Sequence, residues 1–466
     1  MRYRTFDDLL KHQAETLPEH PALRYGEKQW TYKELYAAVC EKAEEYRALG
    51  RTCLGVLSDG SADCVISLFG AAKAGLQLVM LDASLPDEAY PALLHYTDVD
   101  LLWGDEDLAE MLAPHLTRGV PGGSESVLFF TSGTTSRSKA VELTQESLCQ
   151  SAFNGGSLLP LQEDDTLLCT LPLAHVFGFI CGLLWGLYSG ALVALGRGPR
   201  HYADDCLYYR PTALSAVPLL LGFLLKAKAL NPELRLILIG AGECPLPVLA
   251  AAKASGARVS FGYGLTETSS GVALSLGDDP YAMTICPDDA VTIAEDGEIL
   301  IKAPTCLMKG YYKMPEETAK VLQDGLLHTG DLGFIDAEGL LRITGRKKDI
   351  LVLSDGTKIY LPEYEAQLTE AIKAADLPEK MVPAELAVTL KEGRPVLVVC
   401  DASQSAKNAP SCDFTPLSRT VWREALLKAI LPLMKTLPRG QQITDICFTD
   451  QPLPRTATGK LKRYKL

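Results

Sequence analysis

The segment Thr131-Ser132-Gly133-Thr134-Thr135-Ser136-Arg137-Ser138-Lys139 lies between two apolar runs, Val127-Leu128-Phe129-Phe130 and Ala140-Val141. It places six hydroxyl side chains, one glycine and a terminal lysine in nine residues. Hydrogen-bond donors and positive charge of this kind replace the hydration that a bound polyphosphate loses. The segment predicts a phosphate-handling loop held by a preceding strand, and a Ser/Thr-rich surface turn is the alternative that it leaves open.

This loop is not a Walker A loop. That motif requires a glycine directly before the lysine and a hydroxyl residue directly after it. The chain has Ser138 and Ala140 at these places. The phosphate-handling loop therefore belongs to another class.

The composition is that of a globular protein with an acidic balance. A length of 466 residues allows two or three domains at roughly 150 residues each. Lys and Arg number 45 against 58 Asp and Glu, a net charge of −13. This balance argues against general nucleic-acid binding, so an anionic ligand must meet a local positive site.

The cysteines and the N-terminus indicate a cytoplasmic protein. Thirteen cysteines are scattered without the C-x-x-C or Cys/His spacing of a metal site or a disulfide framework. The start, Met1 to Asp8, runs into acidic residues without the apolar core of a secretory signal. An uncharged segment from Val176 to Gly196 reaches the length of a membrane span. Its regularly placed glycines instead favour a buried helix that turns into a buried strand.

Strand-like and helix-like segments alternate through the first part of the chain. Leu54–Leu57 and Leu78–Leu81 read as strands that flank a helix from Ala62 to Gly75, and Thr31 is placed to cap a helix that begins at Tyr32. This alternation predicts an α/β fold with largely parallel sheets. We place a domain boundary near Lys348, followed by mixed helices and strands.

Polar and small residues follow several predicted strands, where open α/β sheets bind ligands. Gly240-Ala241-Gly242 would let a flat ligand approach the backbone, and Glu267 could hold Mg²⁺. A tight turn is the alternative reading in both places. Asp331 suits a ribose diol, although an aspartate before Leu-Gly is often a turn residue.

Two further residues have both a chemical and a structural reading. His175 begins the uncharged segment, and a histidine beside an apolar wall is usually structural. Lys460 lies in Pro454-Arg455-Thr456-Ala457-Thr458-Gly459-Lys460, where it can reach a phosphate from a glycine-hinged loop. A basic tail is the alternative there.

These stretches, in this order, resemble the motifs of the adenylate-forming superfamily of acyl-CoA synthetases, adenylation domains and luciferases. The likeness covers nearly the whole chain. It implies an α/β fold with a large N-terminal domain of stacked sheets, residues 1–346, and a small mobile α+β domain, residues 347–466. The family's active site lies between the two domains.

The resemblance also implies roles for individual residues. The ATP phosphates would be wrapped by the loop residues Thr131, Ser132, Gly133, Thr134, Thr135 and Lys139. The nucleoside would be held by Gly240, Ala241, Gly242, Tyr263, Asp331 and Arg346. Thr266 would meet the α-phosphate and Glu267 would bind Mg²⁺. Lys348 would be the hinge, and Ser354 and Gly356 would face the pantetheine path.

The catalytic residues implied are Lys460, Thr266, Glu267 and His175. A carboxylate that attacks the α-phosphorus of ATP builds negative charge, which Lys460 would stabilise. The stretch Leu173–Phe179, which corresponds to an acyl-pocket wall, has no carboxylate to pair with the ammonium of a free amino acid. A fatty or aryl acid is therefore expected.

The predicted function is an AMP-forming acid–thiol ligase. A carboxylic acid and ATP give acyl-AMP and pyrophosphate, and the CoA thiol then displaces AMP. ATP, Mg²⁺ and CoA are the expected cofactors, and fatty acid metabolism is one expected setting. Two alternatives stay open: a stand-alone adenylation enzyme that loads the phosphopantetheine of an acyl carrier protein, and a non-catalytic nucleotide-binding protein.

Overall fold

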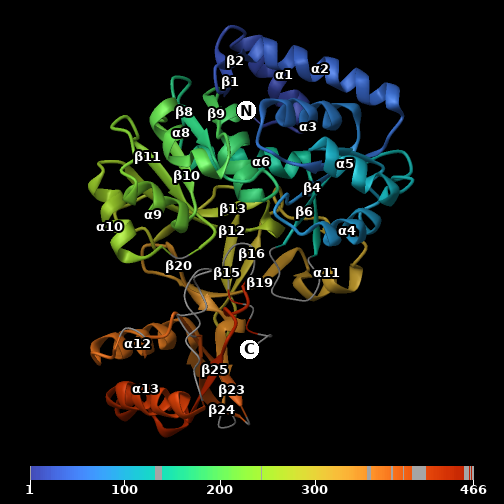
Figure 1. Ribbon diagram of the computed structural model, residues 1–466. Helices are drawn as coiled ribbons and strands as arrows, with labels where there is room; N and C mark the ends of the chain where they lie inside the picture. The colour runs from blue at the N-terminus through green and yellow to red at the C-terminus, as the bar shows by residue number, and fades with distance from the viewer. Residues whose placement is uncertain are drawn as a thin grey trace. The chain divides into compact units, whose positions relative to one another are not determined.

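The computed structural model describes residues 2–131, 139–242, 244–353, 358–378, 381–391, 393–400, 416–455, 461 and 463 (Figure 1). The chain forms two compact units. The large unit runs to Ile343, and the small unit begins at Thr344 and also takes in Gly330–Leu332. The predicted domain limits, 1–346 and 347–466, stay a prediction, because compactness alone does not show that either part folds or moves independently.

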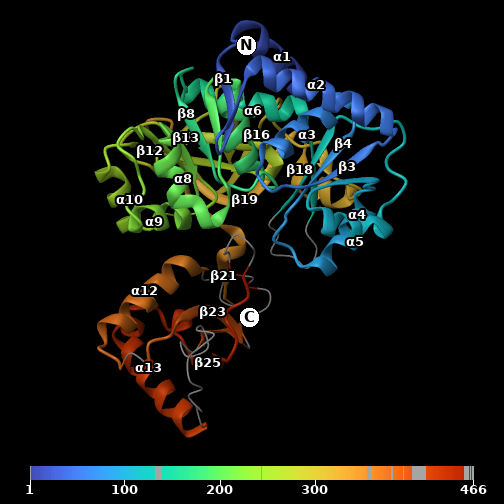
Figure 2. The same cartoon turned by 45° about the horizontal axis from the view of Figure 1, so that its top comes forward.

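The first sheet of the large unit contains the strand that leads to the predicted phosphate loop. Its strand order is β17-β7-β6-β4-β3-β5, and β5, β3, β4 and β6 run parallel. The bounds are β3 Cys53–Leu57, β4 Gln77–Leu81, β5 Leu101–Trp103, β6 Ser126–Phe130, β7 Ala140–Thr144 and β17 Gly310–Tyr311. Figure 2 shows the helices α1, α2 and α3 gathered on one side of β3 and β4.

The second sheet of the large unit is mixed. Its strand order is β15-β16-β19-β20-β14-β13-β12-β11-β10-β8-β9-β1-β2, and β18 pairs with β19. The strands from β9 through β8, β10 and β11 to β12 are parallel, whereas β12 to β14 are antiparallel. The bounds are β1 Pro21–Tyr25, β2 Lys28–Thr31, β8 Thr166–Cys169, β9 Leu192–Leu195, β10 Ala213–Ala216, β11 Leu236–Ile239, β12 Arg258–Leu265, β13 Ser270–Ser275, β14 Met283–Ile285, β15 Ala290–Ile293, β16 Glu298–Lys302, β18 Leu322–Gln323, β19 Leu326–Ile335 and β20 Leu341–Arg346.

The helices begin and end where local chemistry predicts. Thr31 caps α2 in a reciprocal capping box with Glu34, and Gly75 ends α3 in the left-handed region with φ 86°. The helices of the large unit are α1 Phe6–Thr16, α2 Tyr32–Leu49, α3 Ala62–Ala74, α4 Tyr90–Tyr96, α5 Glu106–Leu112, α6 Gln145–Leu158, α7 Trp185–Tyr188, α8 Tyr202–Tyr209, α9 Pro218–Lys226, α10 Leu246–Ala254 and α11 Pro315–Val321.

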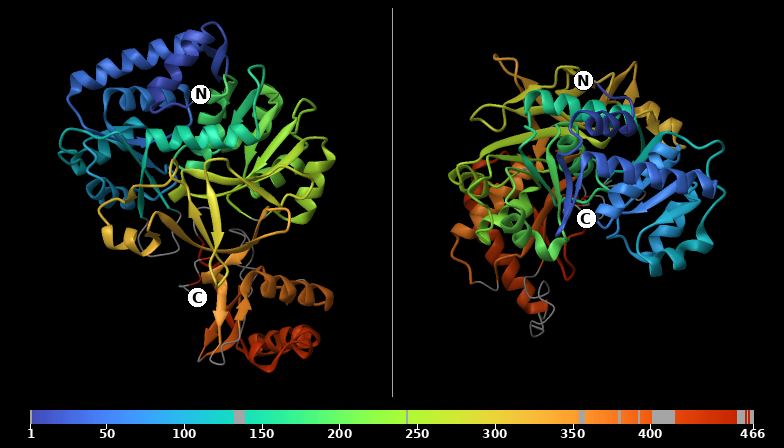
Figure 3. Two further views of the ribbon diagram at one scale, coloured as in Figure 1. Left: turned by 180° about the vertical axis from the view of Figure 1, so that it is seen from behind. Right: turned by 90° about the horizontal axis from the view of Figure 1, so that it is seen from above.

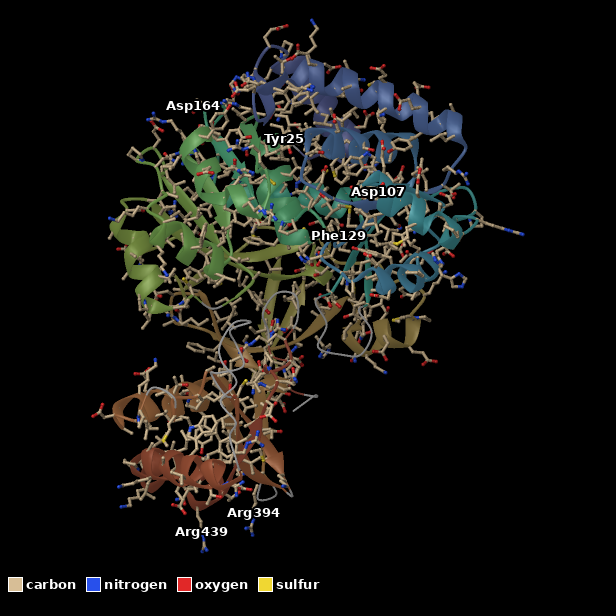
Figure 4. All side chains as sticks on the ribbon, viewed as in Figure 1. Tyr25, Asp107, Phe129, Asp164, Arg394 and Arg439 are labelled. Atoms are coloured by element: carbon tan, nitrogen blue, oxygen red, sulfur yellow. The ribbon has the colours of Figure 1, made fainter. Side chains whose placement is uncertain are left out.

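The uncharged segment is a buried part of this unit. It forms a π-helical stretch, Gly178–Leu184, then α7, and then β9. Phe179 is fully buried, and its ring lies 5.6 Å from that of Phe129, which Figure 4 shows in the interior of the large unit. None of the helices in the described ranges is long and apolar enough to cross a membrane. The predicted helix that turns into a strand is confirmed.

The small unit is an α+β structure with its own core. The hairpin β21 Ile350–Val352 and β22 Lys358–Tyr360 precedes the three-stranded sheet β23 Glu385–Lys391, β24 Arg394–Cys400 and β25 Asp445–Thr449 among the described residues. The helices α12 Leu361–Ala374 and α13 Pro416–Thr436 lie side by side next to this sheet (Figures 1 and 3). Trp422 and Leu426 anchor the core. The predicted fold class is confirmed.

A buried carboxyl group lies in the loop between β14 and β15. Both oxygens of Asp289 are buried without a hydrogen-bond partner among the described residues. Burial, with the neighbouring Asp288 as a smaller cause, raises the pKa of Asp289 to about 7. The folded protein therefore holds a proton that the unfolded chain releases above pH about 4.

We expect Asp289→Asn to change how stability depends on pH. Because the folded-state pKa of Asp289 is the higher one, the free energy of unfolding falls by about 1.4 kcal/mol per pH unit between roughly pH 4 and pH 7. The asparagine variant lacks this pH-dependent loss of stability. The difference between its Tm and that of the wild type should therefore be more positive at pH 8 than at pH 5.

Thermal unfolding at both pH values tests this expectation. The exposed Asp164, which projects from the surface in Figure 4, provides the matched control Asp164→Asn. A Tm difference for Asp289→Asn that is the same at both pH values would contradict the prediction.

Candidate functional site

The predicted phosphate loop leaves the end of β6 and returns into β7. The two strands are antiparallel, and Phe130 pairs with Ala140. Beyond this pair, the N–H of Thr131 donates to the carbonyl of Lys139 over 3.0 Å. The loop therefore has a hydrogen-bonded neck, which fixes where Thr131 and Lys139 lie.

Lys139 is surrounded by groups from a distant part of the chain. Its Nζ lies 2.7 Å from Oε2 of Glu317 in α11 and 4.4 Å from the ring centroid of Tyr311 in β17. The ion pair and the cation–π contact both orient the ammonium group. The lysine is therefore held by two contacts at the neck of the loop.

Tyr311 also connects this lysine to the predicted magnesium ligand. Its hydroxyl donates to Oε1 of Glu267 over 2.7 Å, and the carbonyl of Glu267 accepts from the N–H of Met308 over 2.9 Å. Glu267 is half-buried in the short helical turn Thr266–Thr268 that follows β12. The structure thus brings two predicted site residues into contact with one tyrosine: Lys139 with its ring and Glu267 with its hydroxyl group.

The turn that carries Thr266 and Glu267 depends on a glycine. A Cβ atom on Gly264 would lie 1.5 Å from the carbonyl oxygen of Ser270, because β13 folds back tightly onto β12. Tyr263, one residue earlier, is buried in β12. The backbone of β13 therefore makes a close approach at this strand end.

The turn after β11 is equally close-packed. A Cβ atom on Gly240 would lie 2.7 Å from the ring of Phe177, and Ala241 adopts a left-handed φ of 63°. Gly242 lies beside Pro218. In this structure the small residue Gly240 is therefore needed because the flat ring of Phe177 packs against it.

His175 lies directly before the buried π-helical stretch. Its Nε2 is 3.6 Å from Oδ2 of Asp82, which follows the end of β4. The other oxygen of Asp82 accepts from the N–H and the hydroxyl of Ser84 over 2.9 and 2.7 Å. Asp82 is thereby held facing the imidazole ring, a contact that orients a histidine.

A small cavity lies in the interior of the large unit. Its volume is about 30 Å³, and α6, the π-helical stretch, α7, β11 and β13 enclose it. Its lining includes Ala152, Ile180, Cys181, Trp185 and Leu274, and no charged side chain lines it. A cavity of this volume holds about one water molecule.

Asp331 and Arg346, the two residues predicted to hold the ribose, form an ion pair. Asp331 is buried in β19, and its Oδ1 lies 2.6 Å from Nε of Arg346 at the end of β20. Burial lowers the pKa of the following hinge candidate, Lys348, and the charge of Arg346 adds to this effect. The structure brings Asp331, Arg346 and Lys348 into one charged group.

The C-terminal segment of the small unit is fixed on both sides of its predicted lysine. Arg455 and Leu461 form an isolated antiparallel bridge. Arg463 donates to both oxygens of Glu365 over 2.7 and 2.8 Å, and its Nε lies 3.3 Å from Asp349. Several predicted site residues lie outside the described residues: Ser132, Gly133, Thr134, Thr135, Ser354, Gly356 and Lys460.

The donor set fits magnesium bound together with a nucleotide. Mg²⁺ keeps several water ligands and takes one or two carboxylates plus phosphate oxygens, so it needs no cage of protein ligands. Glu267 supplies one carboxylate, and its Oε1 is already aligned by Tyr311. Among the residues that the structure describes, no group of three or more His, Cys, Asp or Glu side chains gathers for a metal.

Four side chains of these networks were missed by the sequence analysis: Asp82, Tyr311, Glu317 and Arg463. Nothing in the local sequence around Tyr311 points to Lys139. Glu317 is 178 residues from Lys139, and Arg463 is 98 residues from Glu365. Only the folded structure shows these pairs.

Comparisons with known proteins agree with these features. The family profile described as "AMP-binding enzyme" matches residues 10–124 and 117–312. A 2-succinylbenzoate–CoA ligase of Bacillus pumilus is 30% identical over 405 residues, which cover 77% of this chain and 81% of that protein. A ligase of the same name from Bacillus cereus is 26% identical and covers 93% and 99%.

Solved structures show the same fold. The O-succinylbenzoate coenzyme A synthetase of Bacillus subtilis, solved in complex with AMP, has a TM-score of 0.78 and 25% identity, with 98% of this chain and 97% of that chain covered. The same enzyme was solved with ATP and a magnesium ion, again at 25% identity. The chain therefore belongs to the AMP-binding enzyme family, within the adenylate-forming superfamily that its motifs resemble.

Proposed function

We propose that the protein is an AMP-forming acid–CoA ligase. It joins a carboxylic acid to ATP, which gives acyl-AMP and pyrophosphate, and then transfers the acyl group to the thiol of CoA with loss of AMP. The contacts of Lys139 and Glu267 with Tyr311 support this proposal, because they bring a lysine and the carboxylate proposed to bind Mg²⁺ to one side chain.

Different residues of this chain bind different parts of ATP during adenylation. Lys139 and the hydroxyl-rich loop bind the β- and γ-phosphates, while Thr266 lies at the α-phosphate and Glu267 orients the metal. Asp331 accepts hydrogen bonds from the ribose hydroxyls, with Arg346 beside it. Bound magnesium supplies charge neutralisation on the phosphates. Lys460 stabilises the charge that builds as the carboxylate attacks.

The acid is a compact aryl carboxylic acid. The stretch Leu173–Phe179 carries no carboxylate, which disfavours a free amino acid, and the separate cavity beside α6, about 30 Å³, has room for about one water molecule. The buried indole N–H of Trp185 and hydroxyl of Ser151, both in residues that line this cavity, have no hydrogen-bond partner among the described residues. Ligases of aryl acids are among the most similar relatives, whereas none of those named above acts on a fatty acid. Fatty acid metabolism therefore receives no support.

The relatives favour CoA over a carrier protein as the thiol. Those named above are CoA ligases. A non-catalytic role gains no support, since Lys139, Glu267, Asp331 and Arg346 are all present and each forms a contact in the structure. The cytoplasmic location stays a prediction from the cysteines and the N-terminal composition.

Product mass spectrometry tests the proposal. The protein is incubated with ATP, Mg²⁺ and a panel of aryl, short-chain and long-chain acids, with and without CoA. We expect an acyl-CoA and AMP from an aryl acid, and acyl-AMP when CoA is left out. Acyl-AMP that persists in the presence of CoA would favour a carrier protein, and no adenylate from any acid would contradict the enzyme assignment.

A further inference from the structure

The helix α11 presents a carboxylate to the lysine of the phosphate site. Glu317 lies in the first turn of α11, and its Oε2 is 2.7 Å from Nζ of Lys139. The side chains of Lys139 and Glu317 are 23% and 37% exposed, so solvent screens the pair only in part. Hydrogen bonds from Lys139 and then from Lys320 lower the pKa of Glu317 to about 2, which keeps its carboxylate charged.

Glu317 has a second cationic partner on its own helix. Its Oε1 forms an ion pair with Lys320, three residues later in α11. If Lys139 turns towards another anion, Glu317 still keeps one salt bridge. The carboxylate can therefore release Lys139 without being left unpaired, which lowers the cost of the exchange.

Tyr311 keeps Lys139 in place during such an exchange. Its backbone pairs with Val141 in β7, and its N–H donates to Oγ1 of Thr318 in α11 over 2.8 Å. The tyrosine, the helix and the strand after Lys139 are thus one connected structure. The ammonium keeps the ring of Tyr311 as a neighbour whichever anion it binds.

Triphosphate and carboxylate compete for the same ammonium. A nucleotide triphosphate brings several negative charges towards Lys139, and a carboxylate 2.7 Å from the same nitrogen repels them. AMP has no β- or γ-phosphate, so this competition does not affect its binding. The competition therefore lowers the affinity for ATP and leaves the affinity for AMP unchanged.

We propose that Glu317 is an exchangeable counter-ion of Lys139, which gives the lysine up to the β- and γ-phosphates of ATP and takes it back when pyrophosphate leaves. This inference rests on the proposed function, because Lys139 must meet ATP phosphates. It makes Glu317 a positioning residue that weakens the binding of triphosphate and pyrophosphate and leaves AMP binding unaffected.

Calorimetric titration of the full-length protein with Mg·ATP and with AMP, without an acid substrate, tests the proposal. Glu317→Gln removes the charge and keeps the size of the side chain. We expect this variant to bind Mg·ATP about three- to five-fold more tightly, the range of a partly exposed ion pair, with an unchanged Kd for AMP. The matched control is Glu316→Gln, which removes an exposed charge from the same helical turn.

Each outcome decides the question. Tighter ATP binding by Glu317→Gln alone, with unchanged AMP binding, supports the exchange. Weaker ATP binding by Glu317→Gln would mean that the carboxylate holds Lys139 in position for phosphate. An equal effect of Glu317→Gln and Glu316→Gln would mean that only the net charge of the helix matters. Either result overturns the proposal and leaves the ligase function intact, whereas a wild-type protein that binds no ATP contradicts both.

Discussion

Lys460→Ala is expected to reduce acid-dependent pyrophosphate release at least 10²- to 10³-fold, about the effect of removing one preorganised charge-stabilising donor in other enzymes. When the carboxylate oxygen attacks the α-phosphorus, negative charge gathers on oxygens that belong to both reactants. An ammonium group between the two reactants stabilises that charge. In the alanine variant only water is left to stabilise it. Pyrophosphate release measured with a saturating aryl acid gives the size of the effect.

The second half of the reaction provides the control for this variant. Displacement of AMP by the CoA thiol needs no attack on the α-phosphorus, so Lys460→Ala supplied with synthetic acyl-AMP should still form the thioester. Lys462→Ala removes a lysine two positions away in the same basic segment and should retain pyrophosphate release. Unchanged pyrophosphate release by Lys460→Ala would contradict the assignment of Lys460 as the catalytic lysine.

The local chemistry of the sequence was sufficient to predict much of the fold. Thr31 and Gly75 marked a helix start and a helix end that the structure has, because capping depends only on neighbouring residues. The strands before and after Thr131–Lys139 were visible as apolar runs. The uncharged segment after His175 was correctly assigned to the interior because its glycines allow close packing, as at Gly186 against Val193.

The partners of the site residues could not be predicted in the same way. Glu317 meets Lys139 only because β17 pairs with β7, and this pairing of distant segments has no signal in either segment alone. The contact of Asp82 with His175 likewise joins the ends of different elements. At Gly240 the sequence predicted the approach of a flat ligand, which stays a prediction, whereas the structure shows the ring of Phe177 packed against this glycine.

Asp331→Asn is expected to raise the Kd for ATP, and equally for AMP, by about 10²-fold or more. The carboxylate of Asp331 is buried, and its Oδ1 lies 2.6 Å from Nε of Arg346. Losing one member of a buried charged pair costs roughly 2–5 kcal/mol in binding. An asparagine at this position removes the charged acceptor for the ribose hydroxyls and leaves Arg346 without its counter-ion.

A nearby pair separates nucleotide binding from general stability. Asp336, which follows the end of β19, lies 2.7 Å from Nε of Arg342 in β20, and the two residues form a comparable carboxylate–guanidinium pair. Asp336→Asn should lower the Tm but leave the Kd for ATP unchanged. If both variants weaken ATP binding to the same extent, Asp331 acts only through the stability of β19 and β20.

The ribose contact itself can be isolated with 2′,3′-dideoxy-ATP, which lacks both hydroxyls. If Asp331 accepts their hydrogen bonds, the wild-type protein should bind this analogue about as weakly as the Asp331→Asn variant binds ATP. The variant should then lose little more when the hydroxyls are removed, because both changes delete the same interaction and their free energies do not add. Additive losses would place the ribose elsewhere and leave Asp331 with the structural task of holding Arg346.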